Sequence, residues 1–191
     1  MKRSFGALSI AYPLPVFLVG TYDAAGKPDV MVAAWGGICC SDPPSIAVSI
    51  RPVRQTHKNL RLKKAFTVSI PTADIVSETD YCGIVSGTIV DKFARTGMTP
   101  VPAGTVDAPY VDECPVVLEC RLKHGSRLGS HTLFIGEILD VKVDEAVLDA
   151  GGRPDITLMN PLIFDVLRAG YYTPGPFVGE AFVSGKKFLK E

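Results

Sequence analysis

The sequence lacks both a long hydrophobic run and an excess of charge of either sign. Its 20 basic residues balance its 20 acidic ones, so no net field draws the chain toward nucleic acid or acidic lipid. Pro13 and Pro15 interrupt the apolar stretch near the N-terminus, and no run reaches the roughly 18–20 apolar residues of a membrane span. These absences predict a cytoplasmic protein that acts on neither nucleic acid nor membranes.

Motifs for metal binding and hydrolysis are also missing. The three histidines have no HExxH-like spacing, and no serine or cysteine stands in a nucleophile-elbow context. The cysteines form no CxxC pair, and their odd number and scatter fit neither a disulfide framework nor a zinc site. We therefore expect no metal and reduced, buried thiols; the alternative is a redox pair at Cys39 and Cys40, which requires a strained vicinal disulfide. The five cysteines are Cys39, Cys40, Cys82, Cys114 and Cys120.

Glycine-rich phosphate loops of the Walker and Rossmann types are absent, so any phosphate must be held mainly by side chains. The best candidate is segment 51–59, where two guanidiniums and a hydroxyl meet an expected helix start, an arrangement that suits a phosphate dianion. Its alternative is a solvated basic turn. A second candidate is segment 86–93, where Gly87 lets backbone approach a ligand and Lys92 supplies charge. Its alternative is a loop that leaves Lys92 in solvent.

What the sequence does contain is a dense set of short strands. Its 191 residues, 47% apolar and 21% charged, are typical of a globular protein. Turn residues separate the apolar stretches without βαβ alternation, which favours a barrel over a doubly wound sheet. The expected strands are 16–21, 30–35, 46–50, 65–70, 116–123 and 132–143, with a hairpin or bulged turn at 124–131 joining the last two.

A few short helices are expected to pack on this sheet. The predicted fold class is therefore mainly β, a β-barrel with a few short helices. We expect one domain over 1–191, with an extended C-terminal segment from about residue 165 that lies on the surface or on a partner subunit. The expected helices are 55–64 with Thr56 as N-cap, a second from 72 or 74 to 81, and a third at 89–95 ended by Gly97.

Several pieces of the chain follow one another in a specific order, although each is loose alone. Together they resemble the FMN-binding split-barrel family of flavin reductase-like proteins, of the flavoredoxin type, from about Pro13 to Phe164. The pieces are Pro15–Thr21 with Gly26–Asp29, Val32–Trp35, Ser41–Pro44, Arg54–Asn59, Phe66–Pro71, Ser86–Thr88 with Asp91–Phe93, and His131 before Gly136–Glu137.

The resemblance implies FMN held non-covalently at a homodimer interface, with the chemistry on the flavin and no catalytic residue from the chain. It places the phosphate at Arg54, Thr56 and Lys92. The implied cofactor-binding residues are Asp29, Val32, Ala33, Ala34, Trp35, Ser49, Ile50, Arg51, Arg54, Thr56, Asn59, Ser86, Gly87, Lys92, His131 and Phe164.

Asp29 departs from the family pattern, in which we expect Asn. A carboxylate cannot donate to a flavin carbonyl, and it disfavours negative charge on a reduced ring. Asp29 therefore either points away from the flavin or lowers its potential. Trp35, the only tryptophan, is expected either in the core or at a rim beside a flavin or nicotinamide ring.

The leading hypothesis is an FMN-binding electron-transfer oxidoreductase. It would be either an NAD(P)H-dependent flavin or ferric reductase, or a flavoredoxin-like carrier that serves a redox partner protein. One alternative is a non-catalytic barrel that binds flavin or another small ligand. Another is a transferase or hydrolase of an unrelated barrel type, with His131 and Asp91 as acid–base groups.

Overall fold

Antiparallel strands curve into a barrel that is split along one side. The structure, a computed structural model, describes residues 1–189, and the seven strands of its main sheet run in the order β3-β2-β6-β9-β10-β5-β4. At the split, β3 faces β5, and the Ser49 amide donates to the Trp35 carbonyl at 2.8 Å. The mainly β, split-barrel prediction is confirmed. The strands are β2 Phe17–Tyr22, β3 Pro28–Ala33, β4 Gly36–Ser41, β5 Pro44–Ile50, β6 Ala65–Ile70, β9 Val116–Leu128 and β10 His131–Val143.

Two apolar clusters explain why β2 reads as a continuous apolar run. Phe17 and Val19 point into the barrel, whereas Leu18 joins a second cluster outside it with Val30 and Phe93. Helices α2 (Val76–Ile84) and α3 (Lys92–Thr96) cover that outer cluster. Strands buried on both faces lose the alternation of a half-exposed strand.

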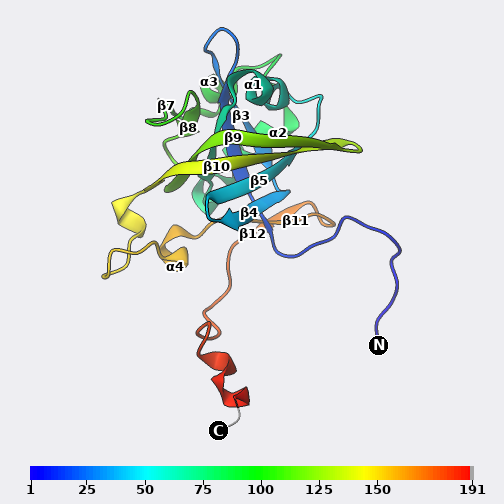
Figure 1. Ribbon diagram of the computed structural model, residues 1–191, viewed down its shortest axis with the longest axis vertical. Helices are drawn as coiled ribbons and strands as arrows, with labels where there is room; N and C mark the ends of the chain where they lie inside the picture. Colours follow the sequence, from blue (N-terminus) through cyan, green and yellow to red (C-terminus); the bar gives the residue numbers. More distant parts are fainter. Residues whose placement is uncertain (190–191) are drawn as a thin grey trace.

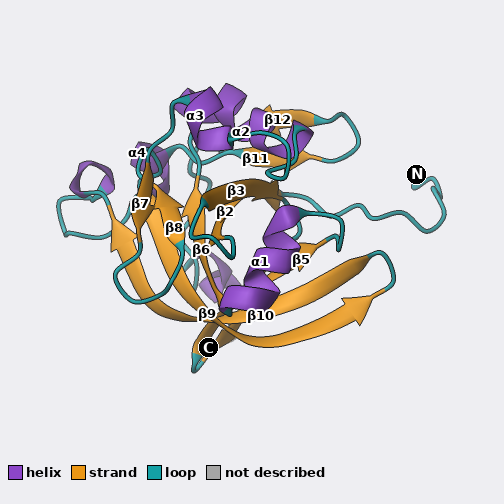
Figure 2. Cartoon of the chain, turned by 90° about the horizontal axis from the view of Figure 1, so that it is seen from above, coloured by secondary structure: helices purple, strands orange, loops and turns teal. Residues whose placement is uncertain are grey.

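Helix α1, Gln55–Lys63, lies across the mouth of the barrel (Figure 2). Its Leu60 side chain is fully buried in the barrel cluster, and Lys64 ends the helix in the left-handed conformation. The prediction that Thr56 caps this helix is wrong. Arg54 is the N-cap residue and makes no side-chain capping bond, whereas Thr56 lies one residue inside the helix.

The β9–β10 hairpin is longer than the sequence indicated. The predicted hairpin is present, but its turn is shorter than 124–131, because the ladder runs on until His131 pairs with Leu128 and leaves only Gly129 and Ser130 as the turn. The outer half of the hairpin projects from the barrel (Figure 1). On the β9 side most of residues 124–128 are exposed, and four of these five residues are polar or glycine, so the apolar alternation that reveals a strand is missing there.

Smaller elements flank the barrel, and both ends of the chain reach away from it (Figure 1). Part of the segment expected to be extended from about residue 165 forms strand β12, so the arm starts only after Tyr172. No helix in residues 1–189 has the length and apolarity needed to cross a membrane. The smaller elements are β1 Leu14–Pro15, β11 Ile163–Asp165 and β12 Gly170–Tyr172 in one sheet, β7 Pro100–Pro102 and β8 Pro109–Val111 in another, and the short helices η1 Ala73–Ile75, η2 Glu145–Val147, α4 Ile156–Met159 and η3 Ser184–Phe188.

Candidate functional site

The split between β3 and β5 contains a hollow of about 150 Å³. Residues of β3 and the turn after it line one side, residues at the end of β5 line the other, and α1 contributes its N-cap residue. Half of the predicted contact residues therefore meet in one place. The predicted residues that line this hollow are Val32, Ala33, Ala34, Trp35, Ser49, Arg51, Arg54 and His131.

A second hollow of about 190 Å³ adjoins the first, because Val32 and Ala34 line both. Phe164, as predicted, lines this second hollow, and so does Tyr171, which the sequence did not single out. The Tyr171 hydroxyl donates to the Asp80 carboxylate at 3.0 Å. Burial and that hydrogen bond raise the pKa of Tyr171 to about 12, so its hydroxyl stays a donor at neutral pH.

Trp35 and His131 form an aromatic wall of the first hollow. Their ring centroids lie 4.6 Å apart with an interplanar angle of 41°, and Trp35 is 38% exposed, which places it at the rim. Burial, with the nearby charge of Arg51, lowers the pKa of His131. The neutral imidazole and the indole together present flat, weakly polar surface to a ligand.

The free edge of β3 supplies backbone groups to the split. The Val30 carbonyl accepts a hydrogen bond from the Lys92 ammonium at 2.6 Å, so it points away from the paired strand β2. Backbone groups two residues apart on a strand face the same edge, and those of Val32 therefore also face the split. Such an edge can pair with a planar heterocycle that carries donors and acceptors along one side.

Two guanidiniums belong to the lining of the hollow. Arg51 and Arg54 both line it, and within residues 1–189 neither forms an ion pair with a carboxylate. Arg54 is also the N-cap of α1, whose first N–H groups lack helical partners and carry partial positive charge. These groups suit a phosphate group.

The other residues predicted to bind phosphate are buried and bonded to one another. Asp29 accepts from the Thr56 hydroxyl at 3.2 Å and pairs with Lys92 at 3.5 Å. Lys92 also donates to the carbonyls of Val30 and Cys82, so the alternative that leaves Lys92 in solvent is wrong. Gly87 packs against the Asp29 carboxylate so closely that a Cβ would collide with it.

Asp29 therefore points into the protein rather than into the hollow. Burial raises the pKa of Asp29, opposed by Lys92 and Thr56. The residue that departs from the family pattern therefore has its own internal cation, Lys92.

The remaining candidate residues do not line the hollow. The Ile50 side chain is buried in the barrel core, the Asn59 amide donates to the Thr21 hydroxyl at 3.1 Å, and Ser86 shares a hydrogen bond with Thr88. Asp91 caps α3 and pairs with Lys27. An acid–base role for Asp91 together with His131 therefore has no geometric support.

The cysteines differ from expectation in one respect. All five are free, but Cys39 and Cys40 are exposed rather than buried. Their thiols donate to the carbonyls of Ser45 and Asp42 respectively, and neither lines the hollows at the split. Exposure follows from their place on β4, an edge strand that the sequence did not reveal.

A split antiparallel barrel with a free strand edge, an aromatic wall and two guanidiniums that form no ion pair within residues 1–189 suits a planar ligand that carries phosphate. Residues 9–166 match the model of the flavin reductase like domain, and the chain belongs to this family. The matched region contains every strand of the seven-stranded sheet.

Solved structures and one curated relative agree with that assignment. The chain is 52% identical to the flavoredoxin of Desulfovibrio vulgaris (Miyazaki F), with a TM-score of 0.93 over 97% of this chain and all of that one. It is 26% identical to an FMN-binding protein from Thermus thermophilus, with a TM-score of 0.79 over 94% and 99% of the two chains. A ferric-chelate reductase (NAD(P)H) of Archaeoglobus fulgidus is 34% identical over 108 residues, 54% of this chain and 60% of the relative.

Proposed function

We propose that the chain is an FMN-binding oxidoreductase that transfers electrons, a cytoplasmic protein whose 191 residues form one flavin-binding domain. The observation that carries this proposal is the hollow in the split, where the free edge of β3, Trp35 and two guanidiniums converge. The names of its relatives support the same class. Bound FMN would supply the electron chemistry, so the chain must bind and orient the ring.

The residues divide into ligand-binding and supporting groups. In our proposal the ring lies along β3 beside Trp35 and His131, and the phosphate lies at Arg54 and Arg51. Thr56 and Lys92, which the family resemblance assigned to the phosphate, instead hold Asp29 and the start of β3 in place. A phosphate dianion beside the Asp29 carboxylate would meet like charge, which disfavours the original assignment.

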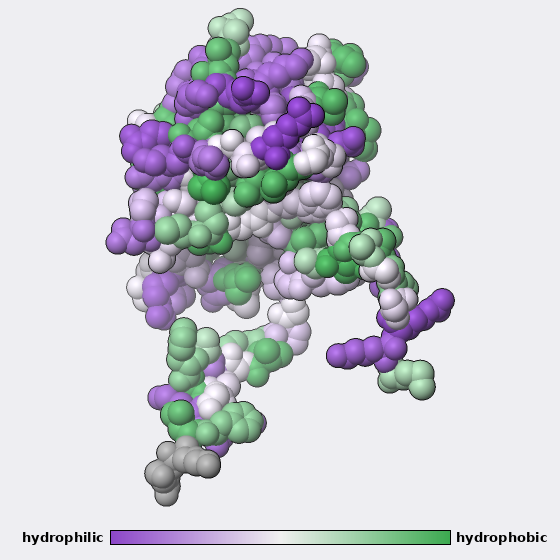
Figure 3. Space-filling view, turned by 45° about the vertical axis from the view of Figure 1, so that its right-hand side comes forward, coloured by the Kyte–Doolittle hydropathy of each residue, from purple (hydrophilic) through white to green (hydrophobic). Residues whose placement is uncertain are grey.

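A homodimer is part of this proposal. The N-terminal arm borders the site, since Leu8 and Ile10 line a hollow together with Trp35. Both arms carry large apolar side chains that the rest of the chain leaves bare, including Phe177 at 76% and Phe182 at 97% exposure (Figure 3). A second copy that covers these arms would also enclose the open side of the site.

The binding proposal is tested by titrating FMN and riboflavin into the protein and following flavin fluorescence. Because the ligands differ only in the phosphate, we expect tighter binding of FMN by about tenfold or more. Arg54→Ala should shrink that preference while leaving riboflavin affinity nearly unchanged. Lys58→Ala is the matched control, an exposed cation on the same helix that does not line the hollow.

The same titration can overturn the proposal. Absence of FMN binding at micromolar concentration would contradict it as a whole. An unchanged FMN preference in Arg54→Ala, with loss of that preference in Thr56→Val, would return the phosphate to the buried cluster.

The electron donor is a separate part of the proposal. Mixing the FMN-loaded protein anaerobically with NADH or NADPH should bleach the flavin absorbance within seconds if the protein is a reductase. Bleaching only by a reduced redox protein would identify a flavoredoxin-like carrier. If neither donor reduces the flavin, the non-catalytic binding barrel is the better description.

A further inference from the structure

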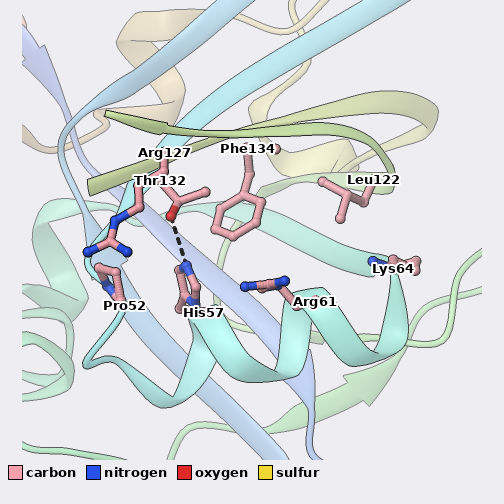
Figure 4. A pocket seen from close by; sticks show the side chains of 9 residues that line it. Pro52, His57, Arg61, Lys64, Leu122, Arg127, Thr132 and Phe134 are labelled. Carbon is pink, nitrogen blue, oxygen red and sulfur yellow. Dashed lines mark hydrogen bonds between the residues drawn. The ribbon is translucent and has the colours of Figure 1, made fainter. Parts of the chain in front are cut away.

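A further cavity lies near the hollow of about 150 Å³ that we assign to the flavin, here called the flavin hollow. Adjacent residues on a strand point to opposite faces, so His131 lines the hollow at the split, whereas Thr132 lines a cavity of about 320 Å³. That cavity lies between α1 and the outer half of the β9–β10 hairpin (Figure 4). The residues that line it are Pro52, His57, Arg61, Lys64, Leu122, Gly125, Arg127, Thr132 and Phe134.

The rim of this cavity is cationic. Arg61, Lys64 and Arg127 line it together with no carboxylate, and within residues 1–189 none of the three forms an ion pair. Lys63, by contrast, is paired with Asp107 at 2.9 Å. Three like charges that line one cavity without a counter-charge repel one another, and an anion in the cavity would relieve that repulsion.

The helix dipole explains only part of this arrangement. Cations at the C-terminal end of a helix are favourable in themselves, which accounts for Arg61 and Lys64 near the end of α1. Arg127 comes from β9 in the hairpin, so the dipole gives it no reason to face the same cavity. Its position is the independent observation that points to an anion.

The floor of the cavity is aromatic and closely packed. His57 is 6% exposed, its Nε2 lies 2.9 Å from the Thr132 hydroxyl, and its ring meets the Phe134 ring edge-on at 5.0 Å. Burial lowers the pKa of His57, and the charges of Arg61 and Arg127 act in the same direction. Both guanidiniums therefore act on this ring, which stays neutral and adds no further charge.

Gly125 packs directly against the Phe134 ring. A Cβ at Gly125 would lie 3.2 Å from that ring, and Phe134 is only 1% exposed, so the aromatic side chains close the floor of the cavity and offer no stacking surface. A ligand in this cavity must therefore be held by the cationic rim. The volume also falls within the range of small-molecule sites and exceeds what a single inorganic anion needs.

We propose that this cavity is a second ligand site, separate from the flavin hollow, for a ligand that carries a chain of phosphate groups, and that these phosphates bind Arg61, Lys64 and Arg127. Guanidiniums bind phosphate through two parallel hydrogen bonds, and three cations match more than one negative charge. The two sites adjoin in sequence at Arg51–Pro52 and His131–Thr132.

Isothermal titration of the protein with ADP tests the proposal, using adenosine and inorganic phosphate as partial ligands. We expect one ADP per chain, weaker binding of phosphate and no measurable binding of adenosine. Arg61→Ala and Arg127→Ala should each weaken ADP by about tenfold or more. Lys58→Ala, on the same helix but outside the cavity, should change the affinity by less than about twofold.

Titrations with and without added FMN separate this site from the flavin hollow. Equal ADP affinity in both, with amide resonances of Gly125 and Thr132 shifted and those of Val32 and Trp35 unchanged, supports the second site. Competition between ADP and FMN, or equal weakening by all three variants, would overturn it. Because the ADP titration without FMN does not depend on flavin binding, failure of the flavin proposal leaves this test intact.

Discussion

At the scale of single residues, the main finding is that the Asp29–Lys92 pair is internal. Lys92 is 4% exposed and Asp29 7%, and each charge is compensated by the other and by neighbouring dipoles. Removing one member of a buried pair leaves the other charge without its partner, which costs more than the pair itself contributes.

We therefore predict that Lys92→Met lowers the free energy of unfolding by about 3–5 kcal/mol. The double variant Asp29→Asn, Lys92→Met should recover most of that loss, because it leaves no buried charge. Urea denaturation of the two variants and of Lys58→Met measures the effect. If Lys92→Met costs no more than the exposed control, the pair does not hold this part of the structure.

A second residue-scale prediction concerns His57 and pH. Its pKa is lowered in the folded protein, so the unfolded chain takes up a proton first as the pH falls below about 6.5. Stability is thus fully present above that pH and is lost as the pH falls toward the folded pKa. His57→Gln should show a smaller drop in unfolding free energy between about pH 8 and pH 5 than the unmodified protein.

Exposed His124 provides the control for that comparison. His124→Gln should leave the pH dependence as it is in the unmodified protein. An identical drop in His57→Gln would mean that other groups carry the acid sensitivity.

At the scale of elements, close approach between strands depends on a few glycines. Gly20 on β2 lies against the Pro109 carbonyl and the Thr67 hydroxyl, and a Cβ would lie 2.6 Å from the Thr67 oxygen. Thr67 also donates to the Pro109 carbonyl, so these neighbours cannot move apart without losing a buried hydrogen bond. A methyl group at this point must displace backbone.

We predict that Gly20→Ala lowers the free energy of unfolding by about 1–3 kcal/mol. Gly37→Ala on the edge strand β4, where no atom lies within 4 Å of the added Cβ, should change it by less than about 0.5 kcal/mol. Thermal or urea denaturation of the two variants decides the matter. Equal stabilities would show that β2 and β8 adjust freely.

At the scale of the whole molecule, the arms are the part with the least intramolecular packing. Residues 1–13 and 173–189 reach away from the barrel (Figure 1) and gather hydrophobic side chains on their surfaces (Figure 3). Apolar surface of this kind is stable in water only when another surface covers it.

We predict that deleting residues 174–191 converts a dimer into a monomer while the barrel stays folded. Light scattering after size exclusion gives the mass, and circular dichroism checks the fold. A full-length chain that is monomeric at micromolar concentration would contradict the homodimer proposal. If the truncated chain binds FMN less tightly, the partner contributes to the flavin site.

How much the sequence revealed depended on how local each signal was. Runs such as 65–70, with Pro71 as a stop, predict their strand because burial on both faces of a short segment fixes its composition. The edge strand β4 and the outer part of β9 were not predicted. Both are largely exposed to solvent, and exposed strands need no alternation of apolar and polar residues. Tyr171 and the cavity beneath the hairpin were missed because their partners come from distant segments.

The sequence by itself determined the class of fold and the segments that build the site, since strand composition, turn residues and motif order are properties of short stretches. Only the tertiary structure decided what each polar side chain does. Lys92 and Arg54 are both cations near expected helix starts, yet one is enclosed with Asp29 and the other lines the hollow. Burial and charge pairing depend on which chain segments meet, and that is a property of the folded molecule alone.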